Sequence, residues 1–498
     1  MHKLDSSYKL IKMRVTNTIL QTVLFFLFFF SYTGIQAQNS NSISKEDGFL
    51  IMAGKAATKS KSVYLGYNNN QKETTNPYFQ KFPAKEYNKD TTIQLSNGLT
   101  IPRGDFINRW MVLKTEIKLA EGNAIAVNDH QVAIAGGISL EKDRNEQAEK
   151  YDPLVDTGVT AEIRYIALQR SRTARECVEK IGELYNKYGI NHPYGFAVAD
   201  SREIWYIEAG GGNHWAAVKV PENACWIQGN SYRIDKLNPK SKDVLTSPGL
   251  FEFTRINNMW DPAKEVFSFK RIFGGADRNL QDSTYVNTLK LWRAINLIAP
   301  SLPVKPGQKY YPTIVKPEQK ITIENIINIL RDEFQNTEYY PYGGKEESVN
   351  PISSPHTTFS SIIEIKGGFP ADIGVVIWTA FSSPVVSPYV PVYFGVDKIP
   401  QEYAKKPDGN KAYKIFNSLT KIYYQKPEQY SAEFPAIYNQ LQEKFFKERK
   451  TIDSNAFRIY KSSYDMSRHL ITVTVNSFVQ EAIELAEQKR NQIKNQKE

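Results

Sequence analysis

The stretch GFLIMAGKAATKSKSVYLGYNNN, residues 48–70, holds two short apolar runs on either side of a polar segment. Runs of this length around a polar turn predict two strands. AIAVN and QVAIAGG, within residues 120–138, predict a second pair of strands. Residues 195–234 predict further strands, with a hairpin turn at Gly210-Gly211-Gly212 rather than a phosphate loop, because no helix opens after these glycines.

Further along the chain the apolar spacing changes to that of helices. Residues 173–188, 284–298 and 321–335 carry apolar side chains at helical spacing, and residues 411–492 are mostly helical with many charges. Residues 362–381 return to the composition of strands. Strands at both ends with helices between them predict an α+β fold in one interleaved domain, residues 48–498, with a helical C-terminal part.

The composition supports a folded protein and gives little sign of nucleic-acid binding. Of 498 residues, 41% are hydrophobic and 23% are charged, which is enough apolar material for a core. The net charge is +10, but Lys and Arg are scattered among acidic residues. The one basic cluster, KRNQIKNQKE at the C-terminus, is typical of a solvated helix end. We therefore expect no nucleic-acid partner, and the oligomeric state stays open.

The first 37 residues have the pattern of a signal peptide. Basic residues precede the uninterrupted apolar run Val23–Phe30, which is too short to span a bilayer. Ile35-Gln36-Ala37 supplies a plausible cleavage site. We predict an exported protein, periplasmic or extracellular, cut near Ala37 and without a stable membrane anchor. Residues 38–47 would then be a short propeptide-like segment, and an uncleaved anchor is the alternative.

Motifs for metals, cofactors or a buried catalytic serine are absent from the sequence. It contains no CxxC, HxxxH, HExxH or Gly-x-Ser-x-Gly pattern. We expect no metal and no cofactor. Cys177, in a helical pattern, and Cys225, in a strand pattern, are the only cysteines. They are interpreted either as two buried apolar residues or as a single disulfide.

Seven segments, in order along the chain, resemble the dipeptidases of the N-terminal-nucleophile hydrolase superfamily, which are related to the lactobacillus dipeptidase and to secernins. The segments are GKAAT (54–58), VNDHQVAI (127–134) and residues 151–177, 199–221, 227–234, 291–301 and 377–396. The resemblance implies a four-layer αββα sandwich, with two packed antiparallel sheets between helices. It also implies peptide-bond hydrolysis of dipeptides.

In that family, as the resemblance implies, a cysteine becomes the mature N-terminus and its thiolate attacks the peptide carbonyl. Its own α-amine serves as the base, because an amine with a pKa near 8 can take the thiol proton within one residue. Here the corresponding position is Gly48, in GFLIMAGK where the family has Cys-Thr-x-Ile-Leu-Val-Gly-Lys. Glycine has no side chain, so it cannot act as a nucleophile.

The charged partners of that thiolate are replaced as well. The family's Arg is Tyr67 here and its Asp is Asn70, while the family's Arg-Pro-Ile-Ser corresponds to residues 350–353, Asn-Pro-Ile-Ser. The oxyanion residue that the resemblance implies is retained as Asn230, which could equally be an ordinary turn residue at a strand end. Tyr67, Asn70 and Asn128 are the candidate substrate-binding residues.

Taken together, these residues predict an exported member of the cysteine dipeptidase family that is catalytically impaired, a possible pseudoenzyme. It would bind small peptides or dipeptides, or act as a scaffold. The alternative is an active peptide or amide hydrolase with a relocated nucleophile, for which Ser42 or Ser44 would serve if processing cut before it.

Overall fold

Two large antiparallel sheets organise the part of the chain that the structure describes. The computed structural model describes residues 46–71, 76–115, 124–140, 143–275, 284–308, 310–342, 350–407 and 409–496. Lys45–Glu498 form one unit by their contacts. The predicted signal peptide and most of the segment 38–47 lie outside the described residues.

The first sheet has seven strands in the order β16-β14-β1-β2-β17-β18-β19. Its strands are β1 (Glu46–Ala53), β2 (Val63–Gln71), β14 (Cys225–Gln228), β16 (Ile314–Val315), β17 (Thr357–Ile365), β18 (Val375–Phe381) and β19 (Val390–Tyr393). The segment quoted first, residues 48–70, therefore forms most of two adjacent strands at the centre of this sheet, as predicted.

The second sheet has eight strands in the order β15-β13-β12-β11-β10-β9-β8-β3. They are β3 (Tyr78–Phe82), β8 (Trp110–Lys114), β9 (Ala124–Asn128), β10 (Ala133–Ser139), β11 (Tyr194–Ala199), β12 (Ile204–Gly211), β13 (His214–Val220) and β15 (Val244–Thr246). Two small ladders pair β4 (Lys85–Glu86) with β7 (Phe106–Ile107) and β5 (Thr92–Gln94) with β6 (Thr100–Pro102). The glycine-rich segment is the β12–β13 hairpin turn, which confirms that prediction.

The two large sheets pack against each other through β1 and β2 on one side and β10 and β11 on the other. The sheets approach closely at Gly136, where a Cβ atom would lie 3.4 Å from Leu50 Cδ2. Side chains on a strand alternate between its two faces. In β11, Ala197 and Ala199 join the core that contains Leu50, while Phe196 and Val198 join a second core on the opposite face. Both faces of the sheet are therefore covered.

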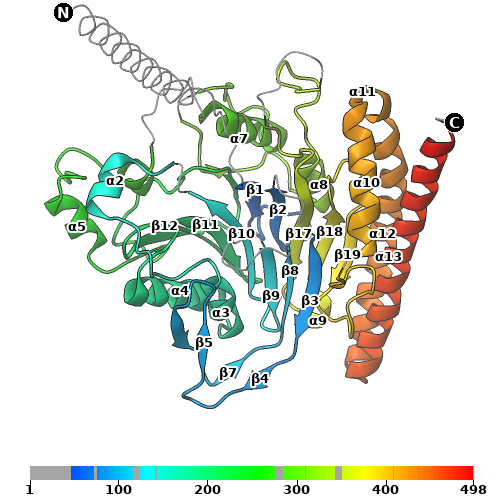
Figure 1. The fold of residues 1–498 in the computed structure, drawn as a ribbon, viewed down its shortest axis with the longest axis horizontal. Coiled ribbons are helices and arrows are strands. Elements are labelled where there is room, and N and C mark those ends of the chain that lie inside the picture. The colour runs from blue at the N-terminus through cyan, green and yellow to red at the C-terminus, as the bar shows by residue number, and fades with distance from the viewer. Residues whose placement is uncertain are drawn as a thin grey trace, which may run out of the picture. The chain divides into compact units, whose positions relative to one another are not determined.

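Helices pack against both large sheets. Figure 1 shows the C-terminal helices, orange to red, side by side along the seven-stranded sheet. Their bounds are α2 (Glu146–Tyr151), α3 (Ile163–Gln169), α4 (Ala174–Tyr188), α5 (Leu250–Ile256), α6 (Phe269–Phe273), α7 (Thr284–Ile298), α8 (Ile323–Leu330), α9 (Ala371–Gly374), α10 (Lys411–Gln425), α11 (Pro427–Tyr430), α12 (Glu433–Tyr460) and α13 (Tyr464–Asn495). Helices α3 and α4 contact the eight-stranded sheet, and α7, α8, α10, α12 and α13 contact the seven-stranded one.

The helix predictions fit best where capping signals are strong. Helix α4 begins after Thr173, whose side chain accepts a hydrogen bond from the Glu176 N–H, and ends at Gly189 with φ of 79°. The expectation of a helix over 321–335 is too long, because α8 ends at Leu330 and Phe334 has φ of 65°. Residues 371–374, expected in a strand, form the short helix α9, since Pro370 O accepts the N–H groups of Ile373 and Gly374.

No helix among the described residues is long and apolar enough to cross a membrane. Within the same residues, no three His, Cys, Asp or Glu side chains lie close enough together to hold a metal ion.

Candidate functional site

Gly48 lies inside strand β1 and not at its start. Glu46 and Asp47 precede it in the strand and pair with Gln71 and Asn70 of β2. On the other side of β1, strand β14 pairs only from Leu50 onward. The Gly48 N–H therefore donates its hydrogen bond to a side chain, Asn230 Oδ1, at 3.2 Å. Asn230 thus continues the ladder of β14 by one bond.

The ring of Tyr67 lies where a side chain of residue 48 would project. A Cβ atom on Gly48 would lie 3.3 Å from Tyr67 Cε2 and 3.5 Å from Tyr67 Oη, both at or below ordinary van der Waals contact. Tyr67 is fully buried and contacts Phe359 edge-on, with 6.1 Å between the ring centroids. The space beside Gly48 is therefore occupied by an aromatic ring that is itself held by the core.

Asn70 lies on the opposite face of the sheet from this pair. Its Oδ1 accepts a hydrogen bond from Thr357 Oγ1 at 2.7 Å, and the neighbouring Asn68 Nδ2 donates to Ile352 O and Leu330 O, both at 2.8 Å. Because the pairing of β1 with β2 is continuous, side chains three residues apart point to opposite faces. Of the two residues that replace the family's charged pair, Tyr67 therefore lies beside Gly48, as Asn230 does, and Asn70 does not.

The third departure from the family pattern, residues 350–353, lies next to Asn70. Ile352 O accepts hydrogen bonds from Asn68 Nδ2 at 2.8 Å and from Asn70 Nδ2 at 3.5 Å. Ser353 is fully buried, and its hydroxyl lies 3.2 Å from that of Ser383. Asn70 and Ile352, which are 282 residues apart in the chain, are therefore neighbours on the helix-covered face of the sheet.

A buried carboxylate holds the loop that carries Asn230. Glu208, fully buried on β12, accepts hydrogen bonds from the main-chain N–H groups of Arg233 at 2.6 Å and Ile234 at 3.1 Å. Burial raises the pKa of Glu208 to about 8, against the opposing effect of these two bonds. The position of Asn230 beside Gly48 thus depends on contacts to the other sheet.

The side chain of Asn128 is fully engaged with the main chain. Its Nδ2 donates to Leu168 O and Ser171 O, both at 2.8 Å, and its Oδ1 accepts from the N–H groups of His130 and Val132, both at 3.0 Å. A carboxamide has two donor hydrogens and two acceptor lone pairs, so this set is complete. Substrate binding by Asn128 stays a prediction, and its bonds favour a role in holding the β9–β10 turn.

Cys177 and Cys225 are free thiols in separate parts of the core. Of the two interpretations, buried apolar residues match the structure and a disulfide does not. Burial raises the pKa of each thiol to about 12, so neither forms the thiolate that nucleophilic attack requires.

Asn69, which the sequence did not single out, is the residue that pairs with Gly48 in β2. It lies on the same face as Tyr67 and is fully buried, and within the described part of the chain neither its Oδ1 nor its Nδ2 has a hydrogen-bond partner. An unsatisfied buried carboxamide costs about 1–3 kcal/mol per group, so a polar partner would stabilise it. Only its position opposite Gly48 in the ladder could have indicated it.

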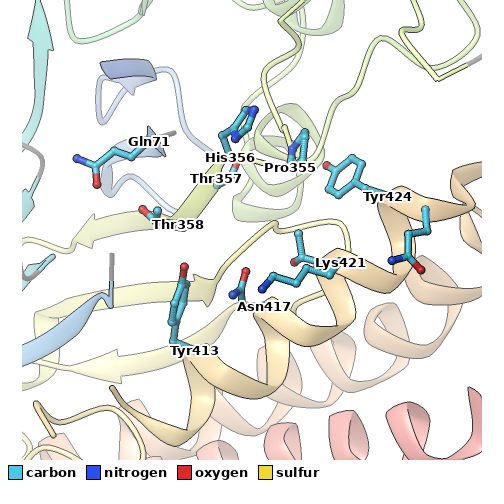
Figure 2. Close-up of a pocket in the computed structure, with 11 residues that line it drawn as sticks. Gln71, Pro355, His356, Thr357, Thr358, Tyr413, Asn417, Lys421 and Tyr424 are labelled. Carbon is cyan, nitrogen blue, oxygen red and sulfur yellow. The ribbon is translucent and has the colours of Figure 1, made fainter. Parts of the chain in front are cut away.

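A pocket of about 360 Å³ opens where β2 ends and β17 begins, and it is closed on the other side by α10. Figure 2 shows Tyr413 and Asn417 pointing from α10 toward Thr358, with Lys421 beside Asn417 on the same helix. Two hydrogen bonds join its wall to the strand that pairs with β1. Thr357 Oγ1 donates to Asn70 Oδ1 at 2.7 Å, and Thr358 Oγ1 donates to Asn69 O at 3.2 Å. The pocket therefore adjoins the end of β2 that pairs with the region of Gly48.

The fold and this site define an α+β protein with two large antiparallel sheets and a glycine, Gly48, inside the central strand β1. Peptidase family C69 matches residues 49–440, a match that begins one residue after Gly48. The chain therefore belongs to Peptidase family C69.

Named relatives agree with that family. A probable dipeptidase of Latilactobacillus sakei is 27% identical over 367 residues, which is 72% of this chain and 76% of that protein. A probable dipeptidase of Salmonella dublin is 29% identical over 302 residues, 58% of this chain and 69% of that protein. Dipeptidase A of Lactobacillus helveticus is 28% identical over 309 residues, 60% of this chain and 64% of that protein. The resemblance found in the sequence is thus confirmed.

Proposed function

We propose that this protein is an exported member of the dipeptidase family that binds short peptides and does not cleave them by the family's cysteine chemistry. Within this proposal the two packed sheets and their helices form the four-layer αββα sandwich of the N-terminal-nucleophile hydrolases. Export rests on the signal-peptide pattern of residues 1–37.

The observation that carries the proposal is the chemistry available at residue 48. The mechanism implied by the family needs a thiolate and a free α-amine on the same residue. Gly48 has no side chain, and its nitrogen is a peptide N–H that donates to Asn230. The room for a side chain is taken by the Tyr67 ring. Both the nucleophile and its base are therefore missing at this position.

Retention of peptide binding is supported by Asn69. A peptide group offers one N–H donor and one C=O acceptor, which complement the two unsatisfied groups of this carboxamide. Keeping an unsatisfied amide in a core has a cost in stability, and sites that do so are commonly functional. A protein that served only as a rigid scaffold would gain stability from an apolar residue here.

The proposal is tested by measuring binding and hydrolysis on one sample of the exported protein, with its N-terminus sequenced. We expect a panel of free dipeptides to bind in calorimetry while no amino acid is released over many hours. Gly48→Ala is the matched control for a substitution at this position. Alanine adds a Cβ atom but no nucleophile, so the variant should also release no amino acid. Steady turnover by the natural protein, abolished by replacing a serine at the sequenced N-terminus, would establish the alternative of a relocated nucleophile.

A further inference from the structure

The pocket between α10 and the start of β17 has an unusual balance of charge. Among the described residues that line it, none is acidic, and most carry hydroxyl, amide or imidazole groups. Lys421 is the single lysine in this set, and no arginine belongs to it. A concave surface of this kind attracts an anionic group, because nothing in the lining neutralises the ammonium.

Lys421 differs in this respect from the lysine that opens the same helix. Lys411 Nζ lies 3.1 Å from Glu487 Oε1 of α13. Lys421 has no ion pair or hydrogen bond within the described part of the chain, and Figure 2 shows its side chain running along α10 beside Asn417. Its charge is therefore available to a ligand.

A residue in an unfavourable backbone conformation contacts two of the residues that line the pocket. Ser382, at the end of β18, has φ of 64°, which costs a non-glycine residue about 1–3 kcal/mol. Its N–H donates to Thr358 O at 2.8 Å, and its hydroxyl lies 2.9 Å from Thr420 Oγ1. Thr358 and Thr420 both line the pocket, so the strained residue fixes two opposite walls at once.

A second support lies behind Tyr424. Glu333, fully buried, accepts hydrogen bonds from Tyr424 Oη at 2.5 Å and from Tyr423 Oη at 2.7 Å. The Tyr424 hydroxyl also lies 3.2 Å from Ser383 Oγ. The ring that forms this wall is thus fixed in orientation before any ligand arrives, which lowers the ordering cost of binding.

We propose that this pocket binds the carboxylate of a small, free peptide, with Lys421 as its charge partner and Asn417 beside it. The peptide nature of the ligand rests on the proposed function, whereas the carboxylate follows from the lining. A single lysine matches the single charge of a carboxylate, while a phosphate carries nearly two charges and is usually met by several cations. The bonds from Thr357 and Thr358 to β2 place this wall of the pocket beside the strand that pairs with Gly48, and we expect the rest of the ligand to lie toward it.

Isothermal titration of the full-length exported protein with three probes tests this inference: L-alanyl-L-leucine, its C-terminal amide, and inorganic phosphate. We expect the free dipeptide to bind at least tenfold more tightly than its amide. Lys421→Met should abolish that preference by weakening only the free dipeptide, and Lys421→Arg should keep it. Lys414→Met, on the same helix but outside the lining, is the matched control and should change nothing. Melting temperatures establish that all variants fold.

Each result separates the carboxylate site from the proposed function. If Lys421→Met lowers the affinity for the dipeptide and for its amide equally, or lowers neither, the carboxylate site is overturned and the proposal of peptide binding stands. Binding of phosphate that depends on Lys421, without binding of either dipeptide probe, would overturn both proposals in favour of an inorganic anion site. Preference of the natural protein for the free dipeptide, lost in Lys421→Met and kept in Lys421→Arg, supports both.

Discussion

The surroundings of Gly48 and the pocket beside α10 share the strand β2, yet they are built in opposite ways. At Gly48 the Tyr67 ring lies within contact distance of any added Cβ, and the main-chain N–H is already bonded to Asn230. At the pocket about 360 Å³ is left open, and Ser382, a residue with positive φ, is hydrogen-bonded to two of its walls. Space that catalysis would need is filled, while space that a ligand would need is kept.

This difference indicates what has been retained in the protein. An unused void in a core costs stability, because the atoms that line it lose their contacts, and filling one with an aromatic ring is favourable. An open polar pocket with an unpaired ammonium brings no such gain. An open pocket beside the filled space at Gly48 agrees with the proposed binding function, and four predictions test that contrast in order of expected size.

The largest effect concerns catalysis. We expect no dipeptide turnover by the natural protein, since removing a nucleophile costs on the order of 10⁶-fold in a serine protease. Gly48→Cys in the uncut chain should stay inactive, because its nitrogen remains a peptide N–H and its Cβ would press on Tyr67. The measurement is amino-acid release over a day.

A variant cut to begin at position 48, with Gly48→Cys, Tyr67→Arg and Asn70→Asp, supplies the thiol, the amine and the charges together. We expect it to be the first to show turnover. Because Asn70 faces the other side of the sheet, restoring Asn70→Asp should add little beyond the first two changes. Full activity of uncut Gly48→Cys would contradict the contrast between the two regions.

The second prediction compares substitutions at two adjacent asparagines of β2, Asn68 and Asn69. Asn68→Leu removes hydrogen bonds to Leu330 O, Ile352 O and Ser360, and should lower the free energy of unfolding by about 2–4 kcal/mol. Asn69→Leu removes an unsatisfied carboxamide and should raise it by about 1–2 kcal/mol, while weakening peptide binding. Urea unfolding and calorimetry measure the two quantities, and loss of stability in Asn69→Leu would refute the binding role.

A third prediction concerns pH and the support behind Tyr424. Burial raises the pKa of Glu333 from 4.5 to about 7, so the folded state holds this proton more tightly than the unfolded state does. Its stabilising contribution is complete below about pH 4.5 and is lost as the pH rises to about 7. Glu333→Gln does not titrate, so the variant should gain about 1–3 kcal/mol relative to the natural protein between pH 4.5 and 8. The measurement is the free energy of unfolding of both proteins as a function of pH. Curves that run parallel would contradict the titration of Glu333.

The smallest effect is at Ser382. Alanine at this position keeps the strain of φ at 64° and loses the hydroxyl bond to Thr420, whereas glycine loses the same bond and relieves the strain. Ser382→Gly should therefore be more stable than Ser382→Ala by about 1 kcal/mol. Thermal unfolding of the pair gives the answer. The reverse order would remove the argument that strain maintains the pocket.

Much of the fold could be predicted from periodicity alone. The strand pairs within residues 48–70 and 120–138, and the hairpin at the three glycines, follow from apolar runs and turn residues, and helix α4 follows from its spacing and caps. Helix α9 was missed because a four-residue helix after Pro370 has no period to detect. The end of α8 was placed too late because its apolar pattern outlasts the helix, and Asp332 Oδ1 takes the Phe334 N–H instead.

The site could be predicted only in part. Gly48 and Asn230, both of which come from the family resemblance, are in direct contact, while their roles stay a prediction. The separation of Tyr67 from Asn70 was available from the sequence, because an odd spacing on a strand places two side chains on opposite faces. The pocket was not available, since its walls come from β2, the start of β17 and α10, which only tertiary structure brings together.

One consequence of the strand that runs through Gly48 concerns maturation. Glu46 and Asp47 are already paired with β2. A protease could cleave the bond before Gly48 only after this part of the strand pairing had opened. Enzymes of the N-terminal-nucleophile type depend on such a cut to become active. Under the proposed function no released amine is needed, so we expect the protein to be ready for its ligand as soon as it has folded.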